Sequence, residues 1–98
     1  MGDLDRAVAD YDQAILIKPD YVAAFYNRGL ALTDKEEYAK AISDFTAVLR
    51  VDPKNPTVLY RRGATLLKSG DVEAGSADLA TAKAIKPDVE DDIRRGGP

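Results

Sequence analysis

The chain has 98 residues and a net charge of −3; 45% of its residues are hydrophobic and 32% are charged, which is the composition of one folded domain and excludes a disordered segment. It has no cysteine and no histidine, which excludes disulfides, thiolate metal sites and the commonest general base and metal ligand. A slightly acidic chain gives no reason to expect nucleic acid, and no apolar run is long enough for membrane insertion.

The first predicted element is an amphipathic helix over residues 3–17. Its apolar side chains recur every three or four residues, which places them on one helix face. Asp3 is expected to be its N-cap, and Pro19 ends it because proline cannot continue the backbone hydrogen bonding of a helix. Asp20 is expected to cap the second helix, which runs to a polar turn at residues 34–36.

The rest of the chain continues this alternation of helix and short turn. Asn55 and Asp71 are expected N-caps, and Gly70 is expected to end the fourth helix in the left-handed conformation. Residues 96–98 should fray. No stretch alternates polar and apolar side chains as a strand does, so the predicted class is all-α. The remaining helices are expected over about residues 37–51, 57–68, 72–85 and 88–95.

A period of 34 residues underlies these helices. A fixed period of this length is typical of stacked helical hairpins that bury their apolar faces on one another. The residues that recur are Pro19, Pro53 and Pro87, Asp10, Asp44 and Asp78, and Arg28-Gly29 with Arg62-Gly63.

The repeated unit resembles the tetratricopeptide repeat, whose signature is W-x2-L-G-x2-Y, then A-x3-F, then P over 34 residues. The resemblance implies a right-handed α-solenoid of antiparallel pairs, each with a leading and a trailing helix, in a single domain over residues 1–98. The domain would comprise a trailing helix alone (2–21), two full repeats (22–55 and 56–89) and the start of a capping helix with a frayed tail (90–98). The matching residues are Phe25-x2-Arg28-Gly29-x2-Leu32, Ala41-x3-Phe45 and Pro53, then Leu59-x2-Arg62-Gly63-x2-Leu66, Gly75-x3-Leu79 and Pro87, and at the start Ala7-x3-Tyr11 and Pro19.

Arginine stands twice where this family usually has leucine. A guanidinium at a packing position needs a partner, because a buried unpaired charge is costly. Arg28 and Arg62 are therefore predicted to form a ladder of ion pairs with Asp10, Asp44 and Asp78, with a structural role and not a catalytic one.

Small residues are expected where the helices of a pair cross. Gly29 and Gly63 on the leading helices would face Ala41 and Gly75 on the trailing ones, which allows the backbones to approach closely. Gly75 replaces the usual alanine of the family. Because a glycine inside a helix costs about 0.5–1 kcal/mol relative to alanine, the fifth helix is expected to be the loosest of the long ones.

The resemblance also implies a function, because tetratricopeptide arrays bind peptides on a concave face lined by leading helices. The expected role is a protein-interaction scaffold with a protein or peptide partner. Arg61, Arg62 and Lys68 give the fourth helix three cations and no anion, which favours an acidic peptide or a free C-terminal carboxylate. Asn27 and Arg61 stand at positions used by carboxylate-clamp members of the family, although Thr57 replaces a clamp lysine. The implied peptide-binding residues are Tyr26, Asn27, Leu30, Tyr60, Arg61 and Lys68.

The residues do not predict an enzyme. The serines and threonines have no histidine to activate them, and the aspartate pairs near the start are two residues apart, so they point to different faces of a helix. We therefore expect no catalytic residue, no metal and no cofactor. The first twenty residues lack the basic start and apolar core of a signal peptide, so a cytoplasmic location is expected.

The order of the helices gives a second hypothesis, from a different functional class. The first helix is a trailing helix, so Ala7, Tyr11 and Ala14 are expected to leave an apolar stripe open to water. The last helix would place Ile93 at the position of Phe25 in the 34-residue period. The alternative function is self-association into a homo-oligomer through these terminal helices, head to tail or by a two-fold contact between first helices. A boundary inside a longer natural array is the other explanation.

Overall fold

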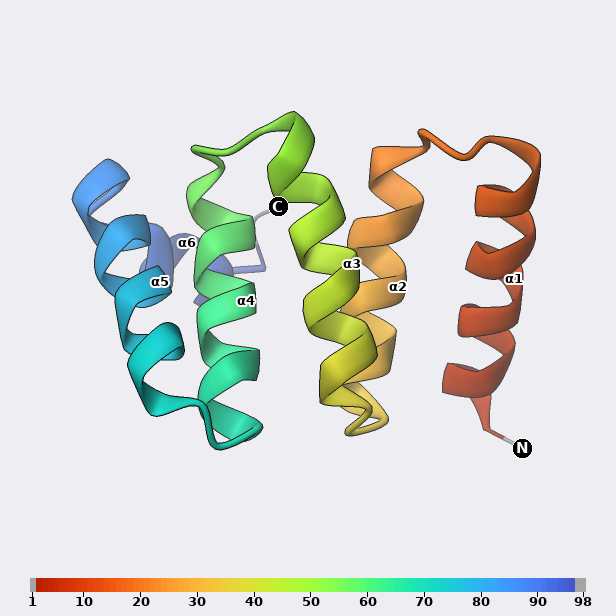
Figure 1. Ribbon diagram of the computed structural model, residues 1–98, viewed down its shortest axis with the longest axis horizontal. Helices are drawn as coiled ribbons and strands as arrows, with labels where there is room; N and C mark the ends of the chain where they lie inside the picture. Colours follow the sequence, from red (N-terminus) through yellow and green to blue (C-terminus); the bar gives the residue numbers. More distant parts are fainter. Residues whose placement is uncertain (1, 97–98) are drawn as a thin grey trace.

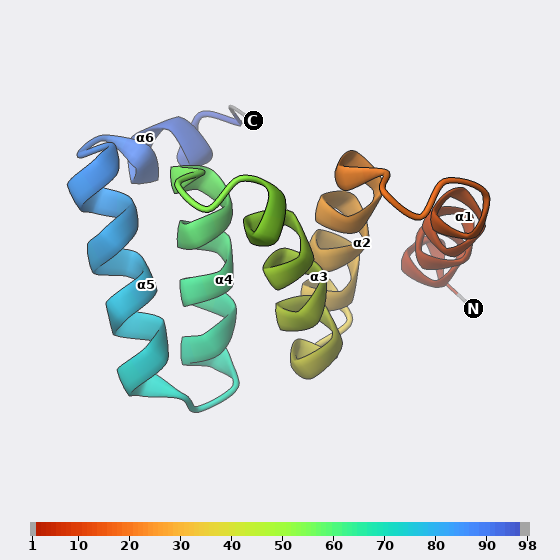
Figure 2. The same cartoon turned by 45° about the horizontal axis from the view of Figure 1, so that its top comes forward.

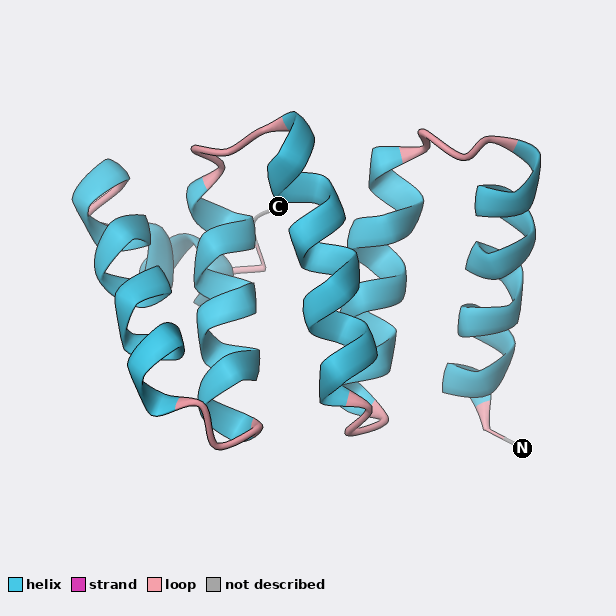
Figure 3. Ribbon diagram, in the orientation of Figure 1, coloured by secondary structure: helices cyan, strands magenta, loops and turns pink. Residues whose placement is uncertain are grey.

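The computed structural model describes residues 2–96; Met1, Gly97 and Pro98, which include the end of the expected frayed tail, lie outside the described residues. In this part of the chain, five helices of 13–15 residues stand side by side in a row (Figure 1). Short turns join them, and no strand occurs between residues 2 and 96 (Figure 3). The predicted all-α solenoid class is confirmed. The helices are α1 (Asp3–Ile17), α2 (Val22–Asp34), α3 (Tyr38–Val51), α4 (Pro56–Lys68), α5 (Val72–Ile85) and α6 (Val89–Arg94).

The starts of α4 and α5 follow the sequence prediction. The Asn55 side chain accepts a hydrogen bond from the backbone N–H of Val58 at 3.1 Å, and Asp71 accepts one from Ala74 at 3.2 Å. These bonds satisfy N–H groups that have no partner inside the helix. Gly70 ends α4 with a φ of 97°, the left-handed conformation expected of it.

The starts of α1 and α2 differ from the prediction. Gly2 is the N-cap of α1 and Tyr21 that of α2, and neither makes a side-chain capping bond. The expected capping roles of Asp3 and Asp20 were wrong. Asp3 is already inside the first turn, where its negative charge complements the helix dipole. Asp20 lies in the turn one residue before the N-cap position.

The core runs along the row between successive helices. Phe45 of α3 is at its centre, because its ring is fully buried and lies 6.0 Å from the ring of Tyr26 on α2. α6 lies across one end of α4 and α5 (Figure 2), and its first residue, Val89, is fully buried there. None of the helices in residues 2–96 is long and apolar enough to cross a membrane. The buried core residues are Leu32, Ala41, Phe45, Val48, Leu49, Val58, Leu59, Ala82 and Val89.

The crossing of α4 and α5 depends on two glycines. A Cβ placed on Gly63 would lie 2.9 Å from the backbone oxygen of Gly75, and one placed on Gly75 would lie 2.8 Å from that of Gly63. These distances are shorter than real Cβ contacts allow, and backbone atoms cannot move aside as the end of a side chain can. Gly75, predicted to loosen α5, thus allows a close approach between the two helices.

We expect Gly75→Ala to lower the free energy of unfolding by about 1 kcal/mol, although alanine is the better helix former. Overpacking of a tight crossing costs roughly 1–3 kcal/mol, and the gain in helix propensity offsets about 1 kcal/mol of it. Urea denaturation followed by circular dichroism measures the change. Ser76→Ala is the matched control, because Ser76 is the exposed neighbour in the same helix. Equal stabilisation by both substitutions would contradict the tight crossing.

Candidate functional site

Two hollows lie between the leading helices α2 and α4. The first, of about 370 Å³, is mainly apolar and lies at the N-terminal halves of the two helices. The second, of about 210 Å³, lies toward their C-terminal halves. The residues that line the first are Val22, Tyr26, Val48, Asn55, Thr57 and Val58, and those that line the second are Leu30, Thr33, Asp34, Phe45, Arg61, Ala64, Thr65 and Lys68.

The second hollow, which we call the cationic hollow, is lined by Arg61, whose guanidinium has one atom without a partner. The Nε atom of Arg61 is buried and has no hydrogen-bond acceptor in residues 2–96. Lys68, about two turns further along the same face of α4, supplies a second positive charge, and Asp34 of α2 supplies a negative one. The wall is therefore less cationic than the sequence of α4 predicts, because Asp34 was not foreseen as a neighbour.

The predicted peptide-binding residues do not all lie in one hollow. Leu30, Arg61 and Lys68 meet in the cationic hollow, and Tyr26 lines the apolar one. Asn27 and Tyr60 line neither. The Tyr60 phenol instead contacts α6: burial, and next a hydrogen bond with the Glu90 carboxylate, raise the pKa of Tyr60.

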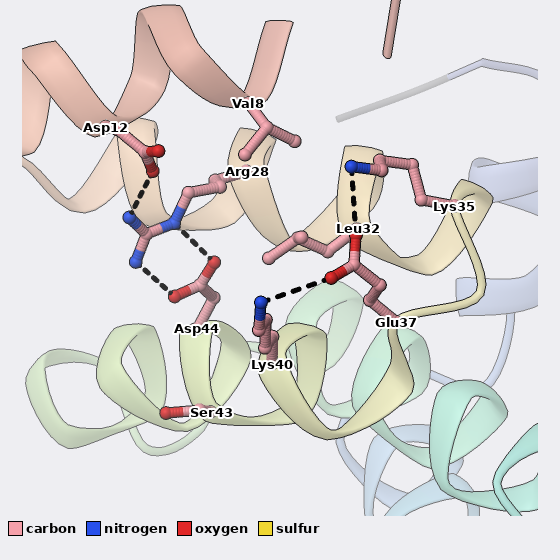
Figure 4. Close-up of a pocket in the computed structure, with 9 residues that line it drawn as sticks. All are labelled: Val8, Asp12, Arg28, Leu32, Lys35, Glu37, Lys40, Ser43 and Asp44. Carbon is pink, nitrogen blue, oxygen red and sulfur yellow. Dashed lines mark hydrogen bonds and ion pairs between the residues drawn. The ribbon is translucent and has the colours of Figure 1, made fainter. Parts of the chain in front are cut away.

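Arg28 forms a charged cluster that joins three helices. Its guanidinium donates two hydrogen bonds to Asp44 of α3, at 2.8 and 2.7 Å, and one to Asp12 of α1 at 2.8 Å. Figure 4 shows Arg28 between these two carboxylates, in a pocket of about 340 Å³ at the α1, α2 and α3 contact. The hydrogen bonds with Asp44 raise the pKa of Arg28, so the pair stays charged.

Arg62 repeats this arrangement one unit along. It donates two hydrogen bonds to Asp78 of α5, at 2.7 and 2.9 Å, and one to the hydroxyl of Thr46 at 3.2 Å. Each arginine thus bonds a residue 16 positions later and another 16 positions earlier. Arg62 therefore points toward α5 and away from the cationic hollow, where only Arg61 and Lys68 of the three predicted cations lie.

Asp10, predicted as the third carboxylate of the ladder, is exposed and bonds neither arginine. Asp12 takes that place instead. The reason is helical geometry, because residues two apart lie on different faces, and α1 turns the face of Val8 and Asp12 toward α2. The 34-residue period pointed to Asp10. The 16-residue spacing before Arg28 and Arg62 was the signal that could have identified Asp12 and Thr46.

The remaining charges of this pocket are also paired within the protein. Lys35 pairs with Asp5 of α1. Lys35 also pairs with Glu37 at the start of α3, and Glu37 pairs with Lys40 (Figure 4). Hydrogen bonding to Lys35 lowers the pKa values of Asp5 and Glu37. Across residues 2–96, no group of three or more carboxylates is placed to hold a metal ion. The pocket therefore supports the contact of α1 with the rest of the row.

The outer face of α1 is less buried than the same face of the trailing helix α3. No residue of α1 is buried. Ala7, Tyr11 and Ala14 are partly exposed, whereas the residues 34 positions later, Ala41, Phe45 and Val48, are 0%, 0% and 3% exposed. At the other end, Ile93 is the fifth residue of α6, as Tyr26 is of α2 and Tyr60 of α4. It therefore does not occupy the position of Phe25 predicted for it.

This row of antiparallel hairpins, with a groove between leading helices, defines the chain as a helical-repeat protein. Residues 1–35 match a family model described as TPR repeat, and residues 22–55 match one described as tetratricopeptide repeat. Together the two matches cover more than half of the chain. The protein belongs to the tetratricopeptide repeat family.

A solved structure supports the fold. The chain is similar to YrrB, described as a TPR protein with an unusual peptide-binding site, with a TM-score of 0.82 and 22% sequence identity. The likeness covers 94% of this chain and 48% of YrrB, so the chain spans about half the length of that protein. At this identity the likeness concerns the fold alone. A comparison with curated proteins gave no match.

Proposed function

We propose that the groove between α2 and α4 binds an extended segment of a partner protein and holds one carboxylate of it in the cationic hollow. The observation that carries this proposal is the buried, unbonded Nε atom of Arg61. A buried donor without an acceptor costs about 1–3 kcal/mol, and a carboxylate is the acceptor that arginine binds best. A ligand carboxylate in the hollow, which Arg61 lines, would give the Arg61 guanidinium an acceptor.

The charge of the hollow narrows the class of ligand. Arg61 and Lys68 carry two positive charges and Asp34 carries one negative charge, so the net charge of the hollow is that of a single cation. This net charge suits one carboxylate better than a run of acidic residues. Leu30 and Ala64 of the same hollow, and the apolar hollow around Tyr26, would receive neighbouring aliphatic side chains. The proposed ligand is thus an apolar segment with one acidic side chain or a free C-terminus, and the role is binding and not catalysis.

We expect Arg61→Glu to weaken binding of such a segment by at least about tenfold, because charge reversal places like charges together. The measurement is fluorescence anisotropy with a panel of apolar peptides that carry a free C-terminus, an amidated C-terminus or a single glutamate. Lys83→Glu, on the exposed surface of α5, is the control with the same change in net charge. Equal affinities of Arg61→Glu and Lys83→Glu for the peptides would contradict the proposal. Equal affinities of the wild type for all three kinds of peptide would contradict it as well.

We propose self-association as a second function. It is supported by the partly exposed stripe of Ala7, Tyr11 and Ala14, whose counterparts on α3 are almost fully buried. An apolar stripe that is buried on α3, one repeat further along, is a surface that a further helix can cover. The molar mass of the 98-residue chain, measured against concentration, tests this function. A constant monomer mass would contradict it.

A further inference from the structure

A third arginine–glycine pair directly follows α6, where the 34-residue period does not find it: Arg95 is the C-cap of α6, and Gly96 has a φ of 80°. α2, α4 and α6 begin at Val22, Pro56 and Val89. Six residues after each start comes an arginine followed by a glycine. The third pair is shifted because the turn before α6 is one residue shorter than the turns before α2 and α4. The three pairs are Arg28-Gly29, Arg62-Gly63 and Arg95-Gly96.

The two inner pairs show what such a pair contacts. Arg28 bonds Asp44 of the next helix, and the face of Gly29 lies against the ring of Phe45. Arg62 bonds Asp78 in the same way, and Gly63 lies against Leu79. An arginine–glycine pair on a leading helix is thus matched by an aspartate followed by an apolar residue on a trailing helix.

One half of this contact is unmatched at each end of the row. On α1, Asp10 is exposed and Tyr11 is partly exposed, and they occupy the positions of Asp44 and Phe45. On α6, Arg95 and Gly96 are exposed. No salt bridge in residues 2–96 involves Asp10 or Arg95. α1 and α6 stand at opposite ends of the molecule (Figure 1), whose longest extent is 35 Å, so the two halves cannot meet within one copy.

We propose that Arg95-Gly96 of one copy docks on Asp10-Tyr11 of a second copy, so that copies join head to tail. This inference rests on the proposed self-association and names its contact. Charge complementarity selects it over the two-fold contact between two α1 helices, which would bring two Asp10 carboxylates toward each other without a cation. The contact is heterologous, so it joins copies into an open row, or into a ring where the rotation between copies closes.

The contact is also expected to be weak. α6 has six helical residues, so it presents a smaller face than α2 or α4. Ala80 stands 34 positions after Thr46, so α5 offers Arg95 no counterpart of the third bond that Arg28 and Arg62 receive. A partly exposed ion pair contributes mainly register and specificity.

The test is a charge exchange measured by sedimentation velocity between about 10 µM and 1 mM, the range in which weak interfaces dissociate. Wild-type mass should rise with concentration. Asp10→Arg and Arg95→Asp alone should each raise the dissociation constant by about tenfold or more, because each places like charges at the contact. An equimolar mixture of the two variants should regain association, since every contact between unlike variants then joins opposite charges. Lys83→Asp controls for the net-charge change of Arg95→Asp.

The outcomes separate this contact from self-association in general. Recovery in the mixture supports the contact. A wild-type chain that associates while neither substitution matters would overturn the contact and leave the second proposed function standing. Stronger association in an equimolar mixture of Asp10→Arg and wild type than in either alone, with no effect of Arg95→Asp, would point to the two-fold arrangement and overturn the contact as well. A monomer at every concentration would overturn both.

Discussion

Arg28→Met is expected to lower the free energy of unfolding by about 3–5 kcal/mol, the cost of removing one partner of a buried ion pair. The reason is the carboxylate that remains. The Asp44 side chain is 5% exposed and accepts both hydrogen bonds from Arg28, so the substitution leaves a buried negative charge without a cation. Urea denaturation at neutral pH, followed by circular dichroism, measures the loss.

Three variants test whether the unpaired Asp44 carboxylate causes this loss of stability. Arg28→Met combined with Asp44→Leu should regain most of the stability, because two apolar side chains can replace a buried ion pair at little cost. Asp44→Ala alone should cost less than Arg28→Met, since Arg28 is 22% exposed and keeps Asp12. Arg62→Met should also cost less, because the Asp78 side chain is 13% exposed. A double variant as unstable as Arg28→Met would mean that packing, and not charge, causes the loss.

The fold could be predicted because period, turn residues and apolar spacing all agree along the chain. Asn55 and Asp71 cap as predicted because each stands directly before an apolar run with no competing residue. The capping role was assigned wrongly near Asp20, where several turn residues adjoin and the sequence does not say which one begins the helix. The short turn before α6 likewise shifted Ile93 by one position relative to the 34-residue period.

The groove was predicted less completely than the fold, because the sequence alone does not show where each side chain points. Arg61 and Arg62 are adjacent and chemically identical, yet they point about 100° apart around α4. One enters the cationic hollow and the other bonds Asp78. Tyr60 was assigned to the groove for its position in the repeat, but it contacts Glu90 of α6, a contact between elements that have no fixed spacing in the sequence.

The period does predict which residues occupy equivalent positions, and burial then distinguishes them. Phe45 and Tyr11 stand 34 residues apart on the same face of α3 and α1. The Phe45 side chain is fully buried against Gly29, whereas Tyr11 is partly exposed. The same chemical change at these two positions therefore measures how much of each face another helix covers.

We expect Phe45→Ala to cost about 3–5 kcal/mol of unfolding free energy, as for other fully buried aromatic side chains. Tyr11→Ala at low micromolar concentration should cost about 1 kcal/mol, because much of its area is already exposed. The measurement is urea denaturation of both variants and the wild type at two protein concentrations. If copies associate through α1, the cost of Tyr11→Ala should grow with concentration while that of Phe45→Ala stays constant, since binding stabilises the folded state by mass action. Equal costs for the two variants at low concentration would show that the face of Tyr11 is covered within a single chain.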